Sequence, residues 1–417
     1  MHLEGGSFMY EQEIMEMKDS VTAMFEDLHR HPERGFNEIR TSGIIAEYLK
    51  KCGLSITEHV AMTGVVGILD SGRPGKTLMI RADMDCLAIK ELADCSYRSE
   101  YEGNMHACGH DGHVTMLLGA AAILAKHKEA FSGKIKFVFQ PAEEETPEFM
   151  KEKVKAAGYD GAGGAAFMVK EGVTEGVDAC LVMHVQPSVP TGKVFVSKKN
   201  ACASSDVFKI TIQGHGGHGA RPHEAVDPVP AAGELISAIH MLPTREVSAL
   251  ETCVFSIGKL ETPGSVWNAV ADSVVLEGGY RTFNQKVREH LTKRVEKLAD
   301  SIAKANRCTL KYEHTEGYQP CINDVKFTEK TVEVLSELLG AENVIDTEEP
   351  AMTSEDCGAY LAKVPGTFFW LGVGDGGNSP ALHNPYFHLN PEALLIGIRV
   401  HVNNAVKMLE YLNTEGV

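Results

Sequence analysis

Apolar residues recur every three or four positions in some stretches of the chain and form short unbroken runs in others. The first pattern predicts helices, and the second predicts strands that are buried on both faces. In the first half of the chain, helices are expected at Ile14–His31, Thr41–Cys52, His113–His127 and, with a break, Phe149–Gly172. Strands are expected at Val65–Leu69, Thr77–Ile80, Lys134–Gln140 and Ala179–Val185. Strands that alternate with helices are typical of an α/β domain.

The pattern changes near Thr191. Strands are then expected at Lys193–Lys198, Val207–Gln213, Cys253–Lys259, Asp272–Tyr280 and Thr309–His314, and helices at Pro228–Met241 and Gln285–Asn306. Two helices among several antiparallel strands predict a compact α+β insert. After Tyr318 the first style returns, with elements expected at Val325–Leu339, Ser354–Lys363, Thr367–Leu371 and Pro391–Leu412.

We therefore predict an α/β domain with a mixed, mostly parallel sheet covered by helices, formed by residues 1–196 and 316–417. A smaller α+β domain, residues 197–315, is inserted into it. The length of 417 residues agrees with two domains, because one ordinary domain is shorter.

Composition narrows the class of protein. A content of 43% hydrophobic and 23% charged residues is typical of a soluble globular chain, and the formal net charge of -17 argues against a nucleic-acid-binding surface. No apolar run reaches the roughly 18 residues that a membrane span needs, and Met1–Gln12 lacks the features of a secretory signal. Ten cysteines without CxxC spacing fit reduced thiols. We expect a cytoplasmic protein without membrane or nucleic-acid partners.

Metal-ligating residue types crowd into Met105–Thr115. His106, Cys108, His110 and His113 lie there among glycines, which allow the tight turns that bring neighbouring side chains together. A thiolate and several imidazoles at this spacing suit a borderline-soft metal such as zinc. Alone, such a stretch is also compatible with a buried cysteine among surface histidines.

Further candidate donors follow predicted strands. In open parallel sheets, functional groups gather at the carboxyl ends of the strands, so these side chains are expected to converge. One carboxylate of an adjacent acidic pair can ligate a metal while the other accepts a proton from water. The alternative for such a pair is a solvated loop, which the neighbouring donors disfavour. The candidates are Asp83, Asp85, Glu143, Glu144, His184 and His383.

Eight motifs, in order along nearly the whole chain, resemble the cocatalytic metallopeptidase family of aminoacylase and carboxypeptidase G. Within it, the sequence is most similar to the branch of hippurate hydrolases, auxin-conjugate hydrolases and aminobenzoyl-glutamate hydrolases. The motifs are Arg81–Asp85, Met105–His113, Gln140–Glu144, Met183–Val185, Gly214–Pro222, Arg281–Phe283, Met352–Asp356 and Leu382–Pro385.

The resemblance implies a metal-dependent amidohydrolase that cleaves N-acyl or N-aroyl amino acids with a metal-activated water. It implies two manganese or zinc ions, with a cysteine rather than an aspartate as the bridging ligand. Glu143 matches the general base, and Asp85 matches an aspartate that orients the metal centre without binding metal. The implied metal ligands are Cys108, His110, Glu144, His184 and His383.

The resemblance also assigns roles in the insert. His218, in the glycine-rich Gly214–Pro222, matches a histidine that reaches across a homodimer to stabilise an oxyanion. Asn268 and Arg281 match positions that bind the substrate carbonyl or free carboxylate. Residues 197–315 are thereby expected to be a dimerisation domain, and the two flanking parts a catalytic domain.

Departures from the family pattern leave the substrate open. Ala88 replaces a usual proline, and Asn268–Asp272 departs from the usual motif. The stretch between Glu144 and His184 is longer than usual, with the extra residues around Thr146–Gly161. None of these changes removes an implied ligand or the base.

Three alternatives remain. A dipeptidase of the same family uses the same residues. A non-catalytic, metal-containing binding protein is disfavoured by the intact Glu143. A cysteine hydrolase with Cys108 as nucleophile leaves the donors on the other strand ends without a role.

Overall fold

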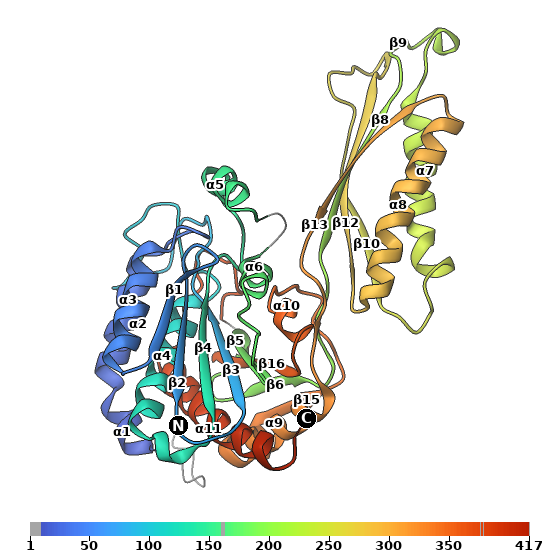
Figure 1. Cartoon of the computed structure of the whole chain (residues 1–417). Coiled ribbons are helices and arrows are strands. Elements are labelled where there is room, and N and C mark those ends of the chain that lie inside the picture. Colours follow the sequence, from blue (N-terminus) through green and yellow to red (C-terminus); the bar gives the residue numbers. More distant parts are fainter. Residues whose placement is uncertain (1–9, 160–162, 376, 378, 417) are drawn as a thin grey trace. The chain divides into compact units, whose positions relative to one another are not determined.

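The structure, a computed structural model, describes residues 10–159, 163–375, 377 and 379–416 (Figure 1). Three stretches discussed above lie partly outside the described residues, namely Met1–Gln12, Thr146–Gly161 and Phe149–Gly172. The chain divides into two compact units. The larger comprises Met1–Ala201, Cys321–Pro350 and Asp356–Val417, and the smaller comprises Cys202–Pro320 and Ala351–Glu355.

The larger unit is built on an eight-stranded sheet in the order β1-β2-β4-β3-β5-β16-β6-β15. Its centre is parallel, because β3 pairs in parallel with β4 and β5, and β16 pairs in parallel with β5. The mixed, mostly parallel sheet is thus confirmed. The strands are β1 (Ser55–Val60), β2 (Gly64–Asp70), β3 (Thr77–Asp83), β4 (Lys134–Gln140), β5 (Ala179–Pro190), β6 (Val194–Ser197), β15 (Val344–Thr347) and β16 (Gly366–Gly374).

Helices cover this sheet, so its central strands are buried along almost their whole length. Every residue from Leu78 to Asp83 is buried, as expected for a central strand between two layers of helices. Helix α4 is buried on nearly all sides and packs against α2, α11 and β3. The helices are α1 (Glu11–Glu16), α2 (Lys18–Arg30), α3 (Ile39–Lys51), α4 (His110–Lys126), α5 (Lys151–Ala156), α6 (Gly164–Lys170), α9 (Val325–Leu339), α10 (Gly358–Leu361) and α11 (Glu392–Thr414).

The smaller unit is an antiparallel sheet in the order β10-β12-β8-β13, packed against two helices, with a separate β9-β11 ribbon. Phe208, Ile210 and Ile212 point into its core, and the residues between them are more exposed. This alternation is what a sheet covered on one face requires. The elements are β8 (Asp206–Gln213), β9 (Gly217–His218), α7 (Pro228–Arg245), β10 (Cys253–Glu261), β11 (Ala269–Val270), β12 (Ser273–Thr282), α8 (Gln285–Ala305) and β13 (Thr309–Glu316).

Some elements differ from the expectation. The helix expected at Ile14–His31 is two helices that meet at Met17. The strand expected at Lys193–Lys198, where the pattern changes, is β6, which pairs with β16 and β15 in the large sheet. The expected boundary after residue 196 therefore falls inside β6. The short strands β7 (Asn200–Cys202) and β14 (Cys321–Ile322) lie where the chain passes between the units.

No helix among the described residues has the length and apolarity that crossing a bilayer requires.

Candidate metal centre

The candidate donors lie at the carboxyl ends of the central strands of the larger unit. Asp83 is the last residue of β3, and Glu143 and Glu144 follow the end of β4. His184 lies within β5, and His383 lies in the loop after β16. Parallel strands deliver these side chains to one edge of the sheet from distant parts of the sequence.

A buried arginine holds the ends of β3 and β4 together. The Arg81 guanidinium donates to Asp83 Oδ2 at 2.6 Å, to Gln140 Oε1 at 2.8 Å and to Asp356 Oδ1 at 3.0 Å. A buried charge is tolerated only when it is paired and hydrogen-bonded, and these contacts provide both. Burial acts to raise the pKa of Asp83, but the charges of Arg81 and His110 hold it well below its usual range. Asp83 is therefore a fixed anion.

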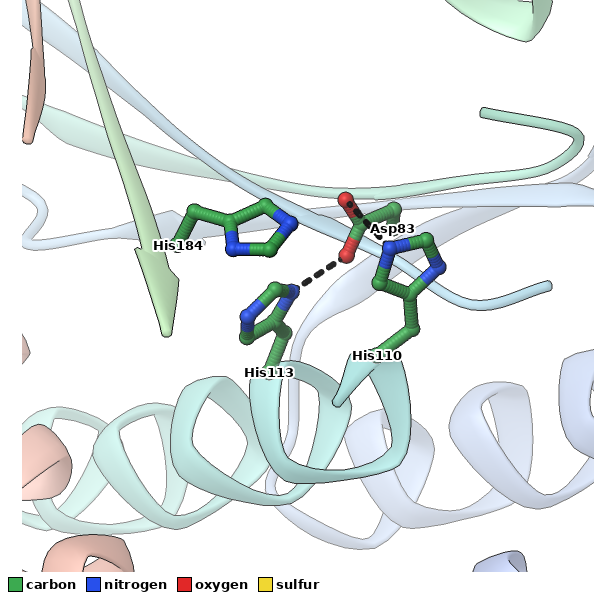
Figure 2. A group of neighbouring side chains, drawn as sticks. All are labelled: Asp83, His110, His113 and His184. Atoms are coloured by element: carbon green, nitrogen blue, oxygen red, sulfur yellow. Dashed lines mark hydrogen bonds and ion pairs between the residues drawn. The ribbon is translucent and has the colours of Figure 1, made fainter. Parts of the chain in front are cut away.

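Asp83 is surrounded by three histidines (Figure 2). Figure 2 shows His110 and His113 on α4 and His184 on β5, all facing the carboxylate. His113 uses both ring nitrogens: Nδ1 lies 2.5 Å from Asp83 Oδ1, and Nε2 accepts the Val185 N–H at 2.9 Å. A ring with both nitrogens bonded in this way has no lone pair left for a metal. His113 therefore positions Asp83 rather than serving as a ligand.

His110 and His184 each present Nε2 instead. His110 Nδ1 lies 3.0 Å from the Asp85 carbonyl oxygen, and His184 Nδ1 lies 2.7 Å from the Val185 carbonyl oxygen. A carbonyl only accepts, so each Nδ1 carries a proton. Burial holds the pKa of His184 well below its ordinary value, so its Nε2 keeps the lone pair of a metal-ligating histidine whose other nitrogen is held by a hydrogen bond. Burial lowers the pKa of His110, but the charge of Asp83 and the contact with Asp85 raise it to about 10, so a metal at its Nε2 would replace a proton. His110 Nε2 is buried and lies 3.4 Å from Asp83 Oδ2, a contact drawn as a dashed line in Figure 2.

The remaining donors close the centre on its other side. Cys108 Sγ lies 3.5 Å from His184 Nε2, and His383 Nε2 lies 3.2 Å from Glu144 Oε1. The donor atoms of Cys108, Glu144 and His383 all lie within 4.8 Å of one another. The same holds for His110, Glu143 and Glu144, so both groups share Glu144.

Asp85 connects the two sides of the centre. Its Oδ1 lies 3.2 Å from His110 Nδ1, and its Oδ2 accepts the backbone N–H of Glu144 at 3.0 Å. One carboxylate thus orients an imidazole on α4 and the acidic pair after β4. Such second-layer contacts fix the direction of the donors that a metal meets.

Two residues in left-handed backbone conformation lie at the centre. Ala142, before the acidic pair, has φ 49°, and His383 has φ 63°. Hydrogen bonds hold both: Ala142 N–H donates to Glu38 Oε1 at 2.8 Å, and His383 N–H donates to the Ala107 carbonyl at 2.8 Å. Non-glycine residues keep such conformations only when the surrounding structure enforces them, and they cluster at functional sites.

The donor set fits a divalent transition metal. It combines a thiol, three imidazoles and two carboxylates. Burial, and then the charges of Glu144 and Glu143, raise the pKa of the Cys108 thiol well above its ordinary range. A nearby cation reverses that effect, so metal binding and loss of the thiol proton are coupled.

The candidate residues of the insert all lie in the smaller unit. His218, in β9, pairs opposite Ala269 of β11, and the carbonyl of Asn268 accepts the Gly219 N–H at 3.0 Å. These two candidates are therefore neighbours. Arg281 lies near the carboxyl end of β12, whereas Asn268 precedes its amino end. Arg281 Nη1 donates to the Met352 carbonyl at 3.3 Å.

Sequence reasoning did not single out some residues that shape the centre. Arg81, Gln140 and Asp356 lie within quoted motifs, but their shared network is visible only in the structure. Glu38 lies in no motif. It is fully buried, and its second oxygen accepts the Thr63 hydroxyl at 2.6 Å.

Comparisons with known proteins agree with this geometry. Thiol, imidazole and carboxylate donors beside an acidic pair at parallel strand ends define, as a class, a metal-dependent hydrolase. Residues 79–406 match Peptidase family M20/M25/M40, and the chain belongs to this family. The resemblance drawn from the motifs is confirmed, and the protein is a metal-dependent hydrolase that acts on amide bonds.

Three relatives cover almost the whole chain. IAA-amino acid hydrolase ILR1-like 4 of Arabidopsis thaliana is 36% identical over 397 residues, which are 94% of this chain and 86% of that protein. Thermostable carboxypeptidase 1 of Saccharolobus solfataricus is 33% identical, over 95% of this chain and 97% of that protein. The crystal structure of a dinuclear metal binding peptidase of the same family from Bacillus subtilis is similar with a TM-score of 0.77 and 29% identity, covering 95% of this chain and 99% of the other.

Proposed function

We propose that this protein hydrolyses the amide bond that joins an acyl or aroyl group to an amino acid. The observation that carries the proposal is the convergence of the five expected donors beside Glu143 at one edge of the sheet. The Arabidopsis relative, named an IAA-amino acid hydrolase, supports this substrate class.

We further propose that Cys108, His110, Glu144, His184 and His383 hold two ions, Mn2+ or Zn2+. The related Bacillus subtilis peptidase is a dinuclear metal binding protein, which supports the number. Thiolate and imidazole donors suit zinc, and carboxylates suit manganese, so the donor set is compatible with both. When bound, such ions lower the pKa of water and polarise a carbonyl oxygen.

Glu143 serves as the proton carrier. Its carboxylate lies within 4.8 Å of donor atoms of His110 and Glu144, and the residue is buried. It accepts a proton from the attacking water as the new C–O bond forms, and it delivers that proton to the leaving amine nitrogen as the C–N bond breaks. The products are a carboxylic acid and a free amino acid.

In the smaller unit, His218, Asn268 and Arg281 act on the substrate, and His218 does so in a second copy of the chain. Ala220 N–H donates to His218 Nδ1 at 3.0 Å, so the ring proton is on Nε2, where it can stabilise an oxyanion. Arg281 lines a groove of about 510 Å3, and guanidinium donors suit the free carboxylate of an amino acid. The partners are thus a small N-acyl amino acid and a second subunit of a homodimer.

A dipeptidase of the same family is the second candidate, because the Saccharolobus relative is named a carboxypeptidase. Dipeptides therefore belong among the substrates to be tested. We also place the protein in the cytoplasm, since its ten cysteines are all thiols in the structure.

The test is hydrolysis of a small panel before and after chelation, with manganese or zinc added back. The panel contains hippurate, N-acetyl amino acids, aminobenzoyl-glutamate, an indole-acetyl amino acid and several dipeptides. We expect cleavage of at least one N-acyl amino acid, loss of activity on chelation and recovery with metal. Cleavage that survives chelation but stops on thiol alkylation would instead identify a cysteine hydrolase. A fully metallated protein that cleaves nothing would favour a binding protein.

A further inference from the structure

A second group of metal-binding side chains lies in the larger unit, outside the candidate centre. His29 comes from α2, and Glu91 and Cys95 come from the connection between β3 and α4. Their donor atoms lie within 4.8 Å of one another. Glu91 Oε1 lies 3.3 Å from His29 Nε2 and 3.4 Å from Cys95 Sγ. Ligands at about 2.0–2.3 Å from a tetrahedral zinc ion are themselves about 3.3–3.8 Å apart, so the spacing is that of ligands of one ion.

Each of the two buried ligands is oriented by a further contact. His29 Nδ1 lies 2.6 Å from Asp111 Oδ2, which reproduces the carboxylate–histidine–metal arrangement of many zinc sites. Glu91 Oε2 accepts the Ser99 N–H at 2.7 Å, so Oε1 is the oxygen that faces His29 and Cys95. The side chains are therefore directed at a common point before any ion binds.

The surroundings contain a second buried histidine and a route of entry. His106 is 2% exposed, and neither of its ring nitrogens has a hydrogen-bond partner among the described residues. Its ring centroid lies 6.4 Å from that of His29. A buried imidazole without partners is costly unless another group satisfies it. Cys95 is partly exposed, which gives an ion access to the group.

Metal binding is compatible with the charges of the group. One divalent cation replaces the proton on His29 Nε2 and the proton on Cys95 Sγ, so the net charge of the group does not change.

We propose that His29, Glu91 and Cys95 bind a zinc ion that fixes the β3–α4 connection to α2. Residues 84–109 of this connection form no helix or strand beyond isolated bridges. Such a long irregular segment is uncommon inside a compact domain. A metal ion that joins it to α2 offsets the conformational entropy that the segment loses on folding. The connection ends at the candidate ligands Cys108 and His110, so the bound zinc ion stabilises the segment that presents them.

The first test measures zinc content of the full-length chain after zinc loading and dialysis. We expect Cys95→Ser to hold one zinc ion fewer per chain than the wild type. The matched control is Cys52→Ser, which removes another partly exposed thiol and should leave the zinc content unchanged. Equal zinc content in Cys95→Ser and the wild type would overturn the proposal.

The second test separates this site from the proposed catalytic centre by spectroscopy. Cobalt-loaded Cys108→Ser lacks the thiolate of that centre, so any remaining thiolate-to-cobalt charge-transfer band comes from another cysteine. We expect the band to persist in Cys108→Ser and to disappear in the Cys95→Ser, Cys108→Ser double variant. A band unaffected by the second substitution would contradict the assignment, whereas failure of the catalytic proposal would leave these spectra unchanged.

Discussion

The three histidines around Asp83 differ in their chemistry because their hydrogen bonds differ. His113 commits both ring nitrogens to hydrogen bonds, whereas His184 holds a backbone carbonyl with Nδ1 and directs Nε2 at Cys108. His110 also holds a backbone carbonyl with Nδ1, but its Nε2 faces the Asp83 carboxylate at 3.4 Å. Sequence spacing could not separate them, since His110 and His113 lie three residues apart on one helix. The partners that distinguish them, Asp83 and Val185, come from different strands.

At the residue scale, Asp85→Asn tests how far orientation controls metal binding. The side-chain amide has one oxygen that accepts hydrogen bonds and one NH2 group that only donates. The contacts that the two Asp85 oxygens make to His110 and to the Glu144 N–H therefore cannot both persist. We expect metal affinity to fall about 10–100-fold while the fold is retained. Competition with a metal-binding dye measures this, and Asp19→Asn, at an exposed position in the first turn of α2, is the control. Unchanged affinity would mean that Asp85 has no orienting role.

Glu143→Gln tests the proton carrier. The substitution keeps size and polarity but removes the basic oxygen. We expect kcat to fall about 100–10,000-fold, with KM and metal content close to those of the wild type. Steady-state kinetics together with metal analysis check this. A variant that hydrolyses the best panel substrate at the wild-type rate would rule out Glu143 as the base.

At the scale of elements, the apolar pattern predicted the buried strands and helices and missed an exposed edge strand. Strand β4 and helix α9 occur at the expected bounds because most of their apolar residues face the core. Strand β1, at the edge of the sheet, was missed since most of Ser55–Val60 is exposed and its sequence is largely polar. The apolar stripe also continues across Met17, so it concealed the break between α1 and α2.

The turn after β4 is held by long-range contacts that the local sequence does not reveal. Glu38 lies at the start of α3, yet its carboxyl group holds the Ala142 N–H and the Thr63 hydroxyl, both far away in sequence. Nothing local to Glu38 predicts these contacts. Through Ala142 they fix the backbone that presents Glu143 and Glu144.

Glu38 gives the protein a pH-dependent stability. Burial, and then the charge of Asp85, raise the pKa of Glu38 to about 8, above the ordinary value of 4.5. The folded state therefore holds a proton that the unfolded state has lost, so this contribution is complete below pH 4.5 and is lost as the pH rises through about 8. We expect Glu38→Gln, which cannot ionise, to gain stability relative to the wild type between pH 5 and pH 8.

Urea unfolding at several pH values measures that difference. Glu33→Gln is the control, because Glu33 accepts backbone hydrogen bonds near α3 but is not fully buried. A stability difference between Glu38→Gln and the wild type that stays constant from pH 5 to pH 8 would contradict the assignment.

At the scale of the whole molecule, the candidate residues divide between two units. The metal donors and Glu143 lie in the larger unit, and His218 lies in the smaller one. A homodimer in which His218 completes the site of the other subunit makes a quantitative prediction. Glu143→Ala and His218→Ala should each be nearly inactive, but a heterodimer of the two contains one site with both residues intact.

Refolding an equal mixture of the two variants produces about half heterodimers, so about a quarter of wild-type activity should return if the subunits assemble at random. Each variant refolded alone is the control for activity that it retains by itself. If His218 instead acts within its own chain, no site in the mixture holds both residues, and activity stays at the average of the two variants. Size-exclusion chromatography of the same samples reports whether dimers form, which separates a cis-acting histidine from a chain that does not dimerise.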